Sequence, residues 1–220
     1  MFTTASMPIR ANFAGNRVLQ VLAAVYGIIW LATAIAPLNR FDWFLENLLV
    51  FGFVGLLAAT YRVFPLSDLS YTLIAVFLSL HAVGAHYTYS ESPLGVWLQD
   101  TWDLERNHYD RLVHFLFGLL FIYPLREAVL RGTRASGPWG YALSFASVLA
   151  LSNTYEILEW AVAEIVDPQA AYAFLGTQGD VFDAQKDSAL AALGAIIGLA
   201  VIAALSRWRS AGSSSAPSPG

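Results

Sequence analysis

The chain lacks cysteine and carries little charge. None of its 220 residues is cysteine, and 13% are charged. The absence of cysteine excludes disulfide bonds, thiolate metal ligands and cysteine nucleophiles, so a metal would need His, carboxylate or other oxygen ligands. Soluble domains usually carry about 25% charged residues, so the low value indicates a membrane protein. The net charge of −4 argues against a nucleic-acid-binding surface, which would be basic.

Long apolar runs account for most of the chain, which is 57% hydrophobic with a mean hydropathy of +0.54. A helix needs about 20 mostly apolar residues to cross a bilayer. Six segments qualify: Val18–Ala36, Phe44–Phe64, Ser70–Tyr87, Leu112–Leu130, Gly140–Val162 and Ser188–Ser206. The first is too long for the apolar part of a cleaved signal peptide. In the last, Gly194 and Gly198 form a GxxxG pair, which is typical of helix packing.

These segments predict an all-α, polytopic membrane protein built as a six-helix bundle. The bundle would span residues 18–207, after a cytoplasmic N-terminal tail, 1–17. A C-terminal tail, 208–220, is rich in Ser, Pro and Gly, and we expect it to be disordered and cytoplasmic.

The basic residues favour one orientation of this bundle. With the N-terminus in the cytoplasm, eight arginines flank the inner ends of the helices: Arg10, Arg17, Arg62, Arg126, Arg131, Arg134, Arg207 and Arg209. Four basic residues then lie outside: Arg40, Arg106, Arg111 and Lys186. The positive-inside rule therefore predicts that both termini are cytoplasmic.

In this orientation, nearly all the costly polar residues lie at the outer face. The residues are Glu46, His81, His86, Asp110, His114, Glu156, Glu159, Asp180, Asp183 and Asp187. Asp110 and His114 are four residues apart and Glu156 and Glu159 three apart, so each pair shares a helix face. His81 and His86 cannot both face one site, and we favour the shallower His86, with His81 reaching from below.

Each of these signals has a structural interpretation as well. His86 could be an interfacial residue, and Asp180 and Asp183 could form a solvated loop with Lys186. Two carboxylates on one apolar helix face repel each other unless they are protonated, paired or bridged by a cation. For Glu156 and Glu159, arginine is therefore the alternative to a metal.

The preferred hypothesis is a metal-dependent membrane hydrolase or transferase, with a divalent ion (Zn, Mn, Fe, Mg or Ca) at the outer face. The candidate ligands are His86, Asp110, His114, Glu156, Glu159, Asp180 and Asp183, and the candidate catalytic groups are Glu156, Glu159 and Asp187. We expect Arg106 and Arg111 to bind a phosphate of a lipid-linked or periplasmic substrate. Two outer segments, 91–110 and 167–180, are predicted to be long non-helical loops that carry binding function.

Two other function classes remain open. A cation- or proton-coupled transporter would use the same carboxylates but needs a polar route across the bilayer. A non-catalytic envelope protein would use the charged cluster as a self-satisfied network that locks the bundle.

Four polar stretches resemble a known family. "GAHYTYSE" at 84–91, "RNHYDRLVHF" at 106–115, "YEILEW" at 155–160 and "FLGTQGDVFDAQKD" at 174–187 are similar to the YjdF-type bacterial inner-membrane proteins, whose function is unassigned. The resemblance implies a multi-spanning helical fold in a bacterial inner membrane and supplies no reaction. The order of "YEILEW", "GDVFDAQKD" and "LGAIIG" also resembles VanZ-like membrane proteins, which implies a place in the cell envelope.

Overall fold

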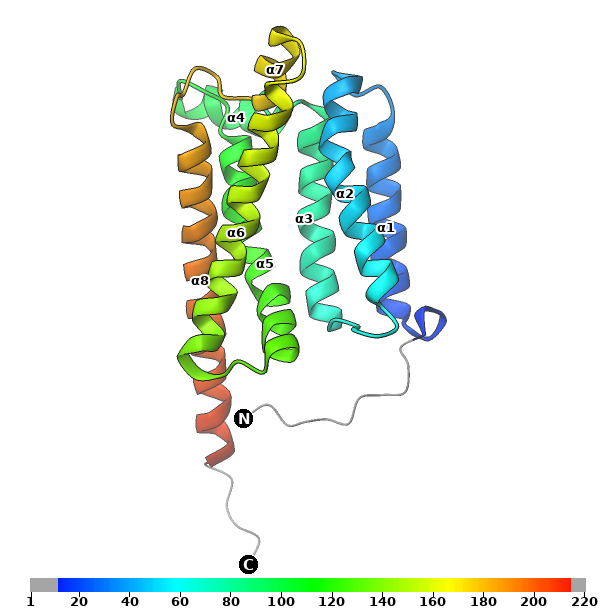
Figure 1. The fold of residues 1–220 in the computed structure, drawn as a ribbon, viewed down its shortest axis with the longest axis vertical. Coiled ribbons are helices and arrows are strands. Elements are labelled where there is room, and N and C mark those ends of the chain that lie inside the picture. Colours follow the sequence, from blue (N-terminus) through cyan, green and yellow to red (C-terminus); the bar gives the residue numbers. More distant parts are fainter. Residues whose placement is uncertain (1–11, 215–220) are drawn as a thin grey trace, which may run out of the picture.

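The computed structural model describes residues 12–214, and every regular element within them is a helix (Figure 1). A short 3-10 turn, Phe13–Gly15, precedes the first helix. The helices are α1 (Arg17–Ala34), α2 (Arg40–Thr60), α3 (Asp68–His86), α4 (Pro93–Trp102), α5 (Tyr109–Thr133), α6 (Gly137–Ala163), α7 (Pro168–Leu175) and α8 (Asp183–Ser214). Helix α8 thus continues past residue 207, the predicted end of the bundle, while 1–11 and 215–220 lie outside the described residues.

Five of the described helices, α1, α2, α3, α5 and α8, are long and apolar enough to cross a membrane. This confirms an all-helical membrane fold for five of the six predicted spans. The sixth, α6, has 27 residues and runs alongside the others in Figure 1. It is not among the five, because polar residues such as Glu156 and Glu159 lower its hydropathy.

The two outer segments predicted to be non-helical each contain a short helix, so that prediction was wrong. Ser92 caps α4 by accepting a hydrogen bond from the backbone N–H of Gly95, and Asp167 caps α7 through Gln169. In each case a proline follows the cap, where its fixed φ suits the first helical turn. Both short helices lie at the same end of the bundle, the upper end in Figure 1.

The long helices form two groups that meet where α3 packs against α5. One group contains α1, α2 and α3, and the other contains α5, α6 and α8. Glycines bring α5 and α8 close together: a Cβ on Gly194 would lie 2.1 Å from the Phe115 carbonyl oxygen, and one on Gly118 would lie 1.9 Å from that of Ala191. The packing role predicted for the GxxxG pair is confirmed, since a Cβ on Gly198 would lie 2.4 Å from the Ile122 side chain of α5.

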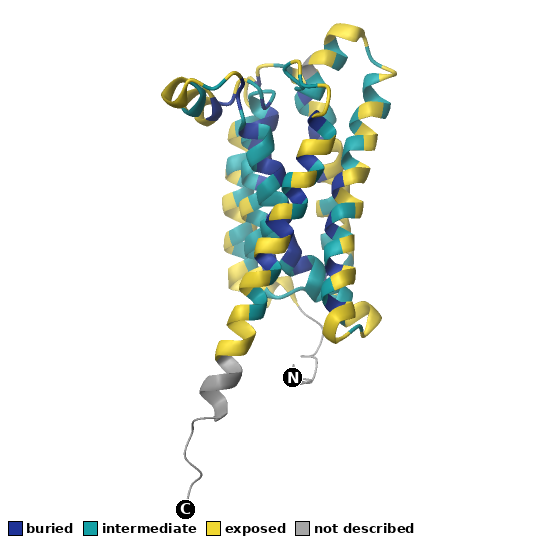
Figure 2. Cartoon of the chain, turned by 90° about the vertical axis from the view of Figure 1, so that its left-hand side faces the viewer, coloured by how far each residue is buried: buried dark blue, intermediate teal, exposed yellow. Residues whose placement is uncertain are grey.

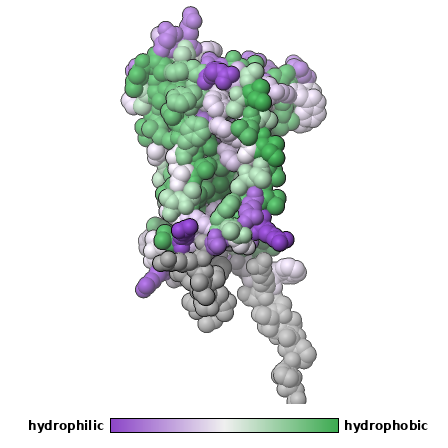
Figure 3. Space-filling model, turned by 90° about the vertical axis from the view of Figure 1, so that its right-hand side faces the viewer, coloured by the Kyte–Doolittle hydropathy of each residue, from purple (hydrophilic) through white to green (hydrophobic). Residues whose placement is uncertain are grey.

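Apolar side chains fill the inside of the bundle and also cover its outside. Phe121 of α5 packs with Val50, Ile74 and Leu78 in one buried cluster. Figure 2 shows buried residues along the inner faces of the helices, and Figure 3 shows a hydrophobic middle zone between hydrophilic ends. Exposed residues such as Ile28, with 68% of its surface accessible, would be unfavourable in water and suit a lipid environment.

Glu127 connects α5 to the start of α3 at the other end of the bundle. Its carboxylate accepts hydrogen bonds from the Ser67 backbone N–H at 2.9 Å and from the Ser70 hydroxyl at 2.5 Å. Arg131 pairs with the same carboxylate at 2.8 Å. An anion is favourable at a helix N-terminus, so this contact fixes the lower end of α3 against α5.

The close approach of α5 and α8 can be tested with Gly194→Ala. The added methyl group must push the two helices apart, which overpacking data put at about 1–3 kcal/mol of lost stability. The measurement is the unfolding temperature in detergent, followed by tryptophan fluorescence. Gly27→Ala is the matched control, because nothing lies within 4 Å of a Cβ there. Equal unfolding temperatures for the two variants would contradict the packing described.

Candidate functional site

Five helices bring polar side chains to one end of the bundle, where α4 and α7 also lie (Figure 1). The start of α2, the end of α3, the start of α5, the end of α6 and the start of α8 meet there. The polar groups form two neighbouring sets. One set is a network of ion pairs between the start of α5 and the segment before α8, and the other is a buried group of carboxylates and histidines below it.

The ion-pair clamp consists of Arg106, Arg111, Asp180, Asp183 and Lys186. Arg106 Nη1 lies 2.5 Å from Asp183 Oδ1 and donates a second hydrogen bond to the Thr177 carbonyl at 3.0 Å. Arg111 pairs with Asp180 and lies 3.3 Å from Asp183. Lys186 reaches Asp180 at 2.5 Å. The clamp therefore holds the loop between α7 and α8 against the start of α5.

An amide pair reinforces the same junction. The Asn107 backbone N–H donates to Gln178 Oε1, and Gln178 Nε2 donates to the Asn107 carbonyl, both at 2.9 Å. The Asn107 side chain accepts from the Tyr109 backbone N–H at 2.9 Å and donates to the Ser92 carbonyl. These bonds link the α4 region, the first turn of α5 and the loop before α8.

Asp110, His114 and Asp187 form a compact group below the clamp. One ligand atom from each lies within 4.8 Å of the others. Asp110 stands in the first turn of α5, with Oδ1 3.6 Å from His114 Nε2 one turn later. Asp187 lies one turn after Asp183 on α8, and the clamp positions the start of this helix. Glu156 of α6 approaches from the other side, with Oε1 3.5 Å from His114 Nδ1.

The acids of this group outnumber their cationic partners. Arg106, Arg111 and Lys186 make their ion pairs with the clamp aspartates. Within residues 12–214, no Arg or Lys nitrogen lies within 4.0 Å of a carboxylate of Asp110, Asp187, Glu156 or Glu159.

Two carboxylate oxygens in this group also lack a hydrogen-bond partner among the described residues. They are Asp187 Oδ1 and Glu156 Oε1. Asp187 is 2% exposed. Glu159 lies three residues after Glu156 on the same face of α6. Buried carboxylates in this arrangement need protons or a cation.

A second polar set lies at the start of α2. Glu46 Oε2 accepts a hydrogen bond from the Tyr155 hydroxyl at 2.7 Å and lies 4.0 Å from His81 Nε2. Tyr89 Oη lies 2.6 Å from His81 Nδ1. One turn before Glu46, Asp42 is 2% exposed, and neither of its carboxylate oxygens has a described partner. Neither Tyr89 nor Tyr155 is among the site residues predicted from the sequence, because a tyrosine near a helix end is typical of an aromatic belt at the membrane surface.

A cavity of about 410 Å³ joins the two buried sets. Its polar end is lined by His81, Tyr89, Asp110, His114 and Tyr155. The rest of its wall is mostly apolar and comes from α2, α3, α5 and α6, with Ser152 and Thr154 of α6 as further polar residues. Ligand pockets usually combine a mostly apolar wall with a few convergent polar groups, so this cavity suits an amphiphilic ligand.

The predicted site residues therefore separate by location. Asp110, His114 and Glu156 come together with Asp187, and Glu159 lies next to them. Asp180, Asp183, Arg106 and Arg111 form the clamp instead. His86 contacts α1, with Nδ1 2.8 Å from the Thr33 carbonyl oxygen, while His81 lines the cavity.

The clamp predicts a specific pH dependence. The hydrogen bond from Lys186, with those from the Phe182 backbone and Arg111, lowers the pKa of Asp180 from 3.8 to about 2. Because the folded pKa is depressed, the contribution of Asp180 to stability is complete above about pH 4 and is lost as the pH falls towards about 2.

The measurement is the unfolding temperature of the wild type minus that of Asp180→Asn, from neutral pH downwards. We expect a positive difference at neutral pH that shrinks to zero in acid. Asp100→Asn, an exposed change on α4, is the control. A difference that is independent of pH would contradict a charged clamp.

Comparisons with known proteins agree with the membrane fold. Residues 18–208 match the family described as "Predicted membrane protein (DUF2238)". "Inner membrane protein YjdF" of Escherichia coli (strain K12) is 39% identical over 180 residues, which cover 81% of this chain and 86% of that protein. No solved structure matches the chain. The family match covers most of the sequence and all of its long helices, so the chain belongs to the DUF2238 family of membrane proteins.

Proposed function

We propose that this protein is a metal-dependent membrane enzyme whose ion is bound by Asp110, His114 and Asp187. The observation that carries the proposal is the convergence of three ligand atoms within 4.8 Å, next to buried carboxylate oxygens without partners. Asp187 and His114 are 2% and 9% exposed, so water does not readily stabilise their charges. A bound divalent cation would neutralise the group and take up the free lone pairs.

Mixed imidazole and carboxylate ligation narrows the choice of metal. Imidazole suits zinc and iron, carboxylates also suit manganese, and magnesium and calcium prefer oxygen ligands alone. With one His and two Asp as the nearest donors, we expect zinc, iron or manganese. Glu156 faces Nδ1 of His114, whereas Asp110 faces Nε2, so Glu156 would either orient the imidazole ring or act as a base beside the ion.

The chemistry that such a site supports is ester hydrolysis or transfer, with phosphate esters as the preferred class. A bound ion would act as a Lewis acid and lower the pKa of a water molecule. In hydrolysis, Glu156 would take the proton of that water as it attacks phosphorus, and the ester oxygen would leave. Glu156 would then return the proton to the leaving oxygen, so that one water is consumed and one ester bond is broken. Glu159, beside Glu156, would orient its carboxyl group.

We further propose that the site lies at the outer face of the inner membrane. The relative from Escherichia coli is named an inner membrane protein. The start of α1 and the end of α8 lie at the end of the bundle opposite the site (Figure 1). With α6 as a sixth span, the positive-inside rule assigns that opposite end to the cytoplasm. The carboxylates of α6 would be tolerated in the bilayer because the ion neutralises them.

The ion pairs of the clamp limit the phosphate binding expected of Arg106 and Arg111. To bind a substrate phosphate, Arg106 and Arg111 would have to break their ion pairs with Asp183 and Asp180. We therefore propose that the first role of the clamp is to position Asp187, which lies one turn after Asp183 on α8. Anion binding by the arginines would be a second role, available when the aspartates release them.

The two alternative classes fit less of the arrangement. A transporter needs polar groups that continue towards the opposite end, whereas the cavity below His114 is lined by Phe117 and Phe121. A purely structural network accounts for the clamp but leaves the buried oxygens of Asp187 and Glu156 unsatisfied. Proton or metal flux into liposomes would favour the transporter over the enzyme.

Metal analysis of the purified protein tests the proposal. We expect about one ion per chain in the wild type and at least a tenfold weaker affinity in Asp187→Asn and His114→Ala, as for the loss of groups that support a metal site. Asp100→Asn should retain the ion. Chelation should lower the unfolding temperature of the wild type and leave that of Asp187→Asn unchanged. A wild type without metal, and with chelator-independent stability, would contradict the proposal.

A further inference from the structure

The cavity opens sideways, between α2 and α6. Its lining on α2 includes Leu48 and Leu56, which are 46% and 58% exposed, and its lining on α6 includes Leu151 and Leu158, at 46% and 41%. These side chains belong to the outer surface and to the cavity wall at the same time. In contrast, α3 and α5 provide a deep wall of buried residues, such as Leu78 and Phe121. The mouth therefore lies on the lipid-facing side of the bundle.

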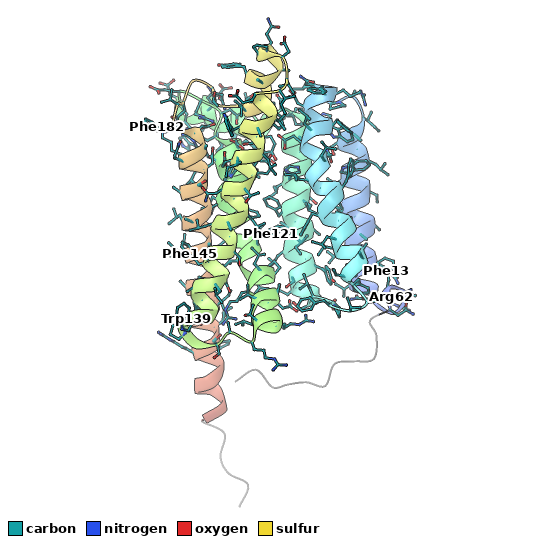
Figure 4. All side chains as sticks on the ribbon, in the orientation of Figure 1. Phe13, Arg62, Phe121, Trp139, Phe145 and Phe182 are labelled. Atoms are coloured by element: carbon teal, nitrogen blue, oxygen red, sulfur yellow. The ribbon has the colours of Figure 1, made fainter. Side chains whose placement is uncertain are left out.

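The depth of the cavity corresponds to one leaflet of a bilayer. On α5 its lining runs from Asp110 to Phe121, a span of roughly 16 Å at 1.5 Å per residue. Half of a hydrocarbon core about 30 Å thick is about 15 Å. Figure 4 shows Phe121 about half-way along the bundle, between α5 and α3. The cavity thus extends from the polar end of the bundle to about the middle of the membrane.

We propose that the substrate is a membrane lipid of the adjoining leaflet, with one hydrocarbon chain in the cavity between α2 and α6 and its phosphate group beside Asp110 and His114. A volume of 410 Å³ lies in the lower part of the range for ligand pockets, about 300–1,000 Å³, and suits one chain better than the two of an ordinary phospholipid. The polar end is the part of the cavity nearest the candidate metal ligands. The chemistry at the phosphate rests on the proposed function, whereas binding of the chain does not.

The surrounding bilayer limits how much free energy of binding the cavity can contribute. A chain that moves from the bilayer into an apolar cavity gains little hydrophobic free energy, because both environments are apolar. The cavity therefore selects and aligns a chain, and the high concentration of lipid in the surrounding leaflet keeps it occupied whether or not a metal is bound at its polar end. We therefore expect that blocking the mouth lowers binding of the chain, whereas removing a metal ligand lowers the metal content.

Gly52→Leu blocks the mouth without disturbing the packing. Gly52 lines the cavity on α2, and nothing lies within 4 Å of a Cβ at this position. The added leucine would occupy space that the chain needs. Gly27→Leu on α1 is the matched control, because its Cβ position is equally open and α1 contributes no residue to the lining.

The experiment uses a long-chain alkyl phosphate with a diazirine at the chain end, in phosphatidylcholine vesicles that contain the full-length protein. Illumination should label peptides around Phe117 and Phe121 in the wild type and in Gly27→Leu, and an excess of unlabelled alkyl phosphate should suppress the label. Gly52→Leu should lose the label severalfold while keeping the unfolding temperature of the wild type, which shows that it is folded.

The result also separates this proposal from the metal site. Asp187→Asn should lose the metal and retain chain-end labelling, since the deep part of the cavity does not involve that residue. Equal labelling of Gly52→Leu and Gly27→Leu would overturn the proposal. Label spread over the lipid-facing side of α1, without enrichment on α5, would overturn it as well. Labelling of the cavity in a wild type that binds no metal would support the lipid site and reject the enzyme.

Discussion

Charge neutralisation at one end of the bundle is the constraint on which the rest of the structure depends. Moving a carboxylate into the membrane costs about 2.5–3.5 kcal/mol on insertion scales, and several such groups meet here. The clamp neutralises two of these carboxylates, because Arg106 and Arg111 pair with Asp183 and Asp180. The acids below the clamp have no such partners, and this imbalance is the reason to expect a cation.

The helix packing and the site depend on each other. The glycines of α5 and α8 allow a close approach, and the same two helices carry Asp110 and Asp187 near their starts. A small change in the distance between α5 and α8 would therefore alter the spacing of the ligands. On the other side, α2 leaves room towards α6, and this looser contact produces the cavity. Tight packing brings Asp110 and Asp187 together, and loose packing leaves the cavity beside Asp110.

Much of the fold could be predicted from the sequence, because the length of an apolar run and the position of its polar end are local properties. Five spans and the gathering of Asp110, His114 and Glu156 followed from such patterns. The rotation of α3 could not be predicted, since it depends on the contact of His86 with α1. For that reason His81, rather than the favoured His86, lines the cavity.

The sequence also could not predict which aspartates belong to the clamp and which to the buried group below it. Asp180, Asp183 and Asp187 have a spacing that suits one helical stripe, but α8 begins only at Asp183, and the preceding loop carries Asp180 to Lys186 and Arg111. Long side chains that meet across a loop leave no periodic signal. The short helices α4 and α7 are recognisable from their Ser92–Pro93 and Asp167–Pro168 starts, which the prediction of non-helical loops overlooked.

The central claim is that the buried acids are balanced by a bound cation rather than by protons. Infrared difference spectroscopy of the carboxyl groups, before and after chelation, tests it most directly. The account predicts that removing the ion produces new absorption from protonated carboxyl groups, and that Asp187→Asn abolishes this change. Protonated carboxyl absorption that is already present and does not respond to chelator would contradict the account.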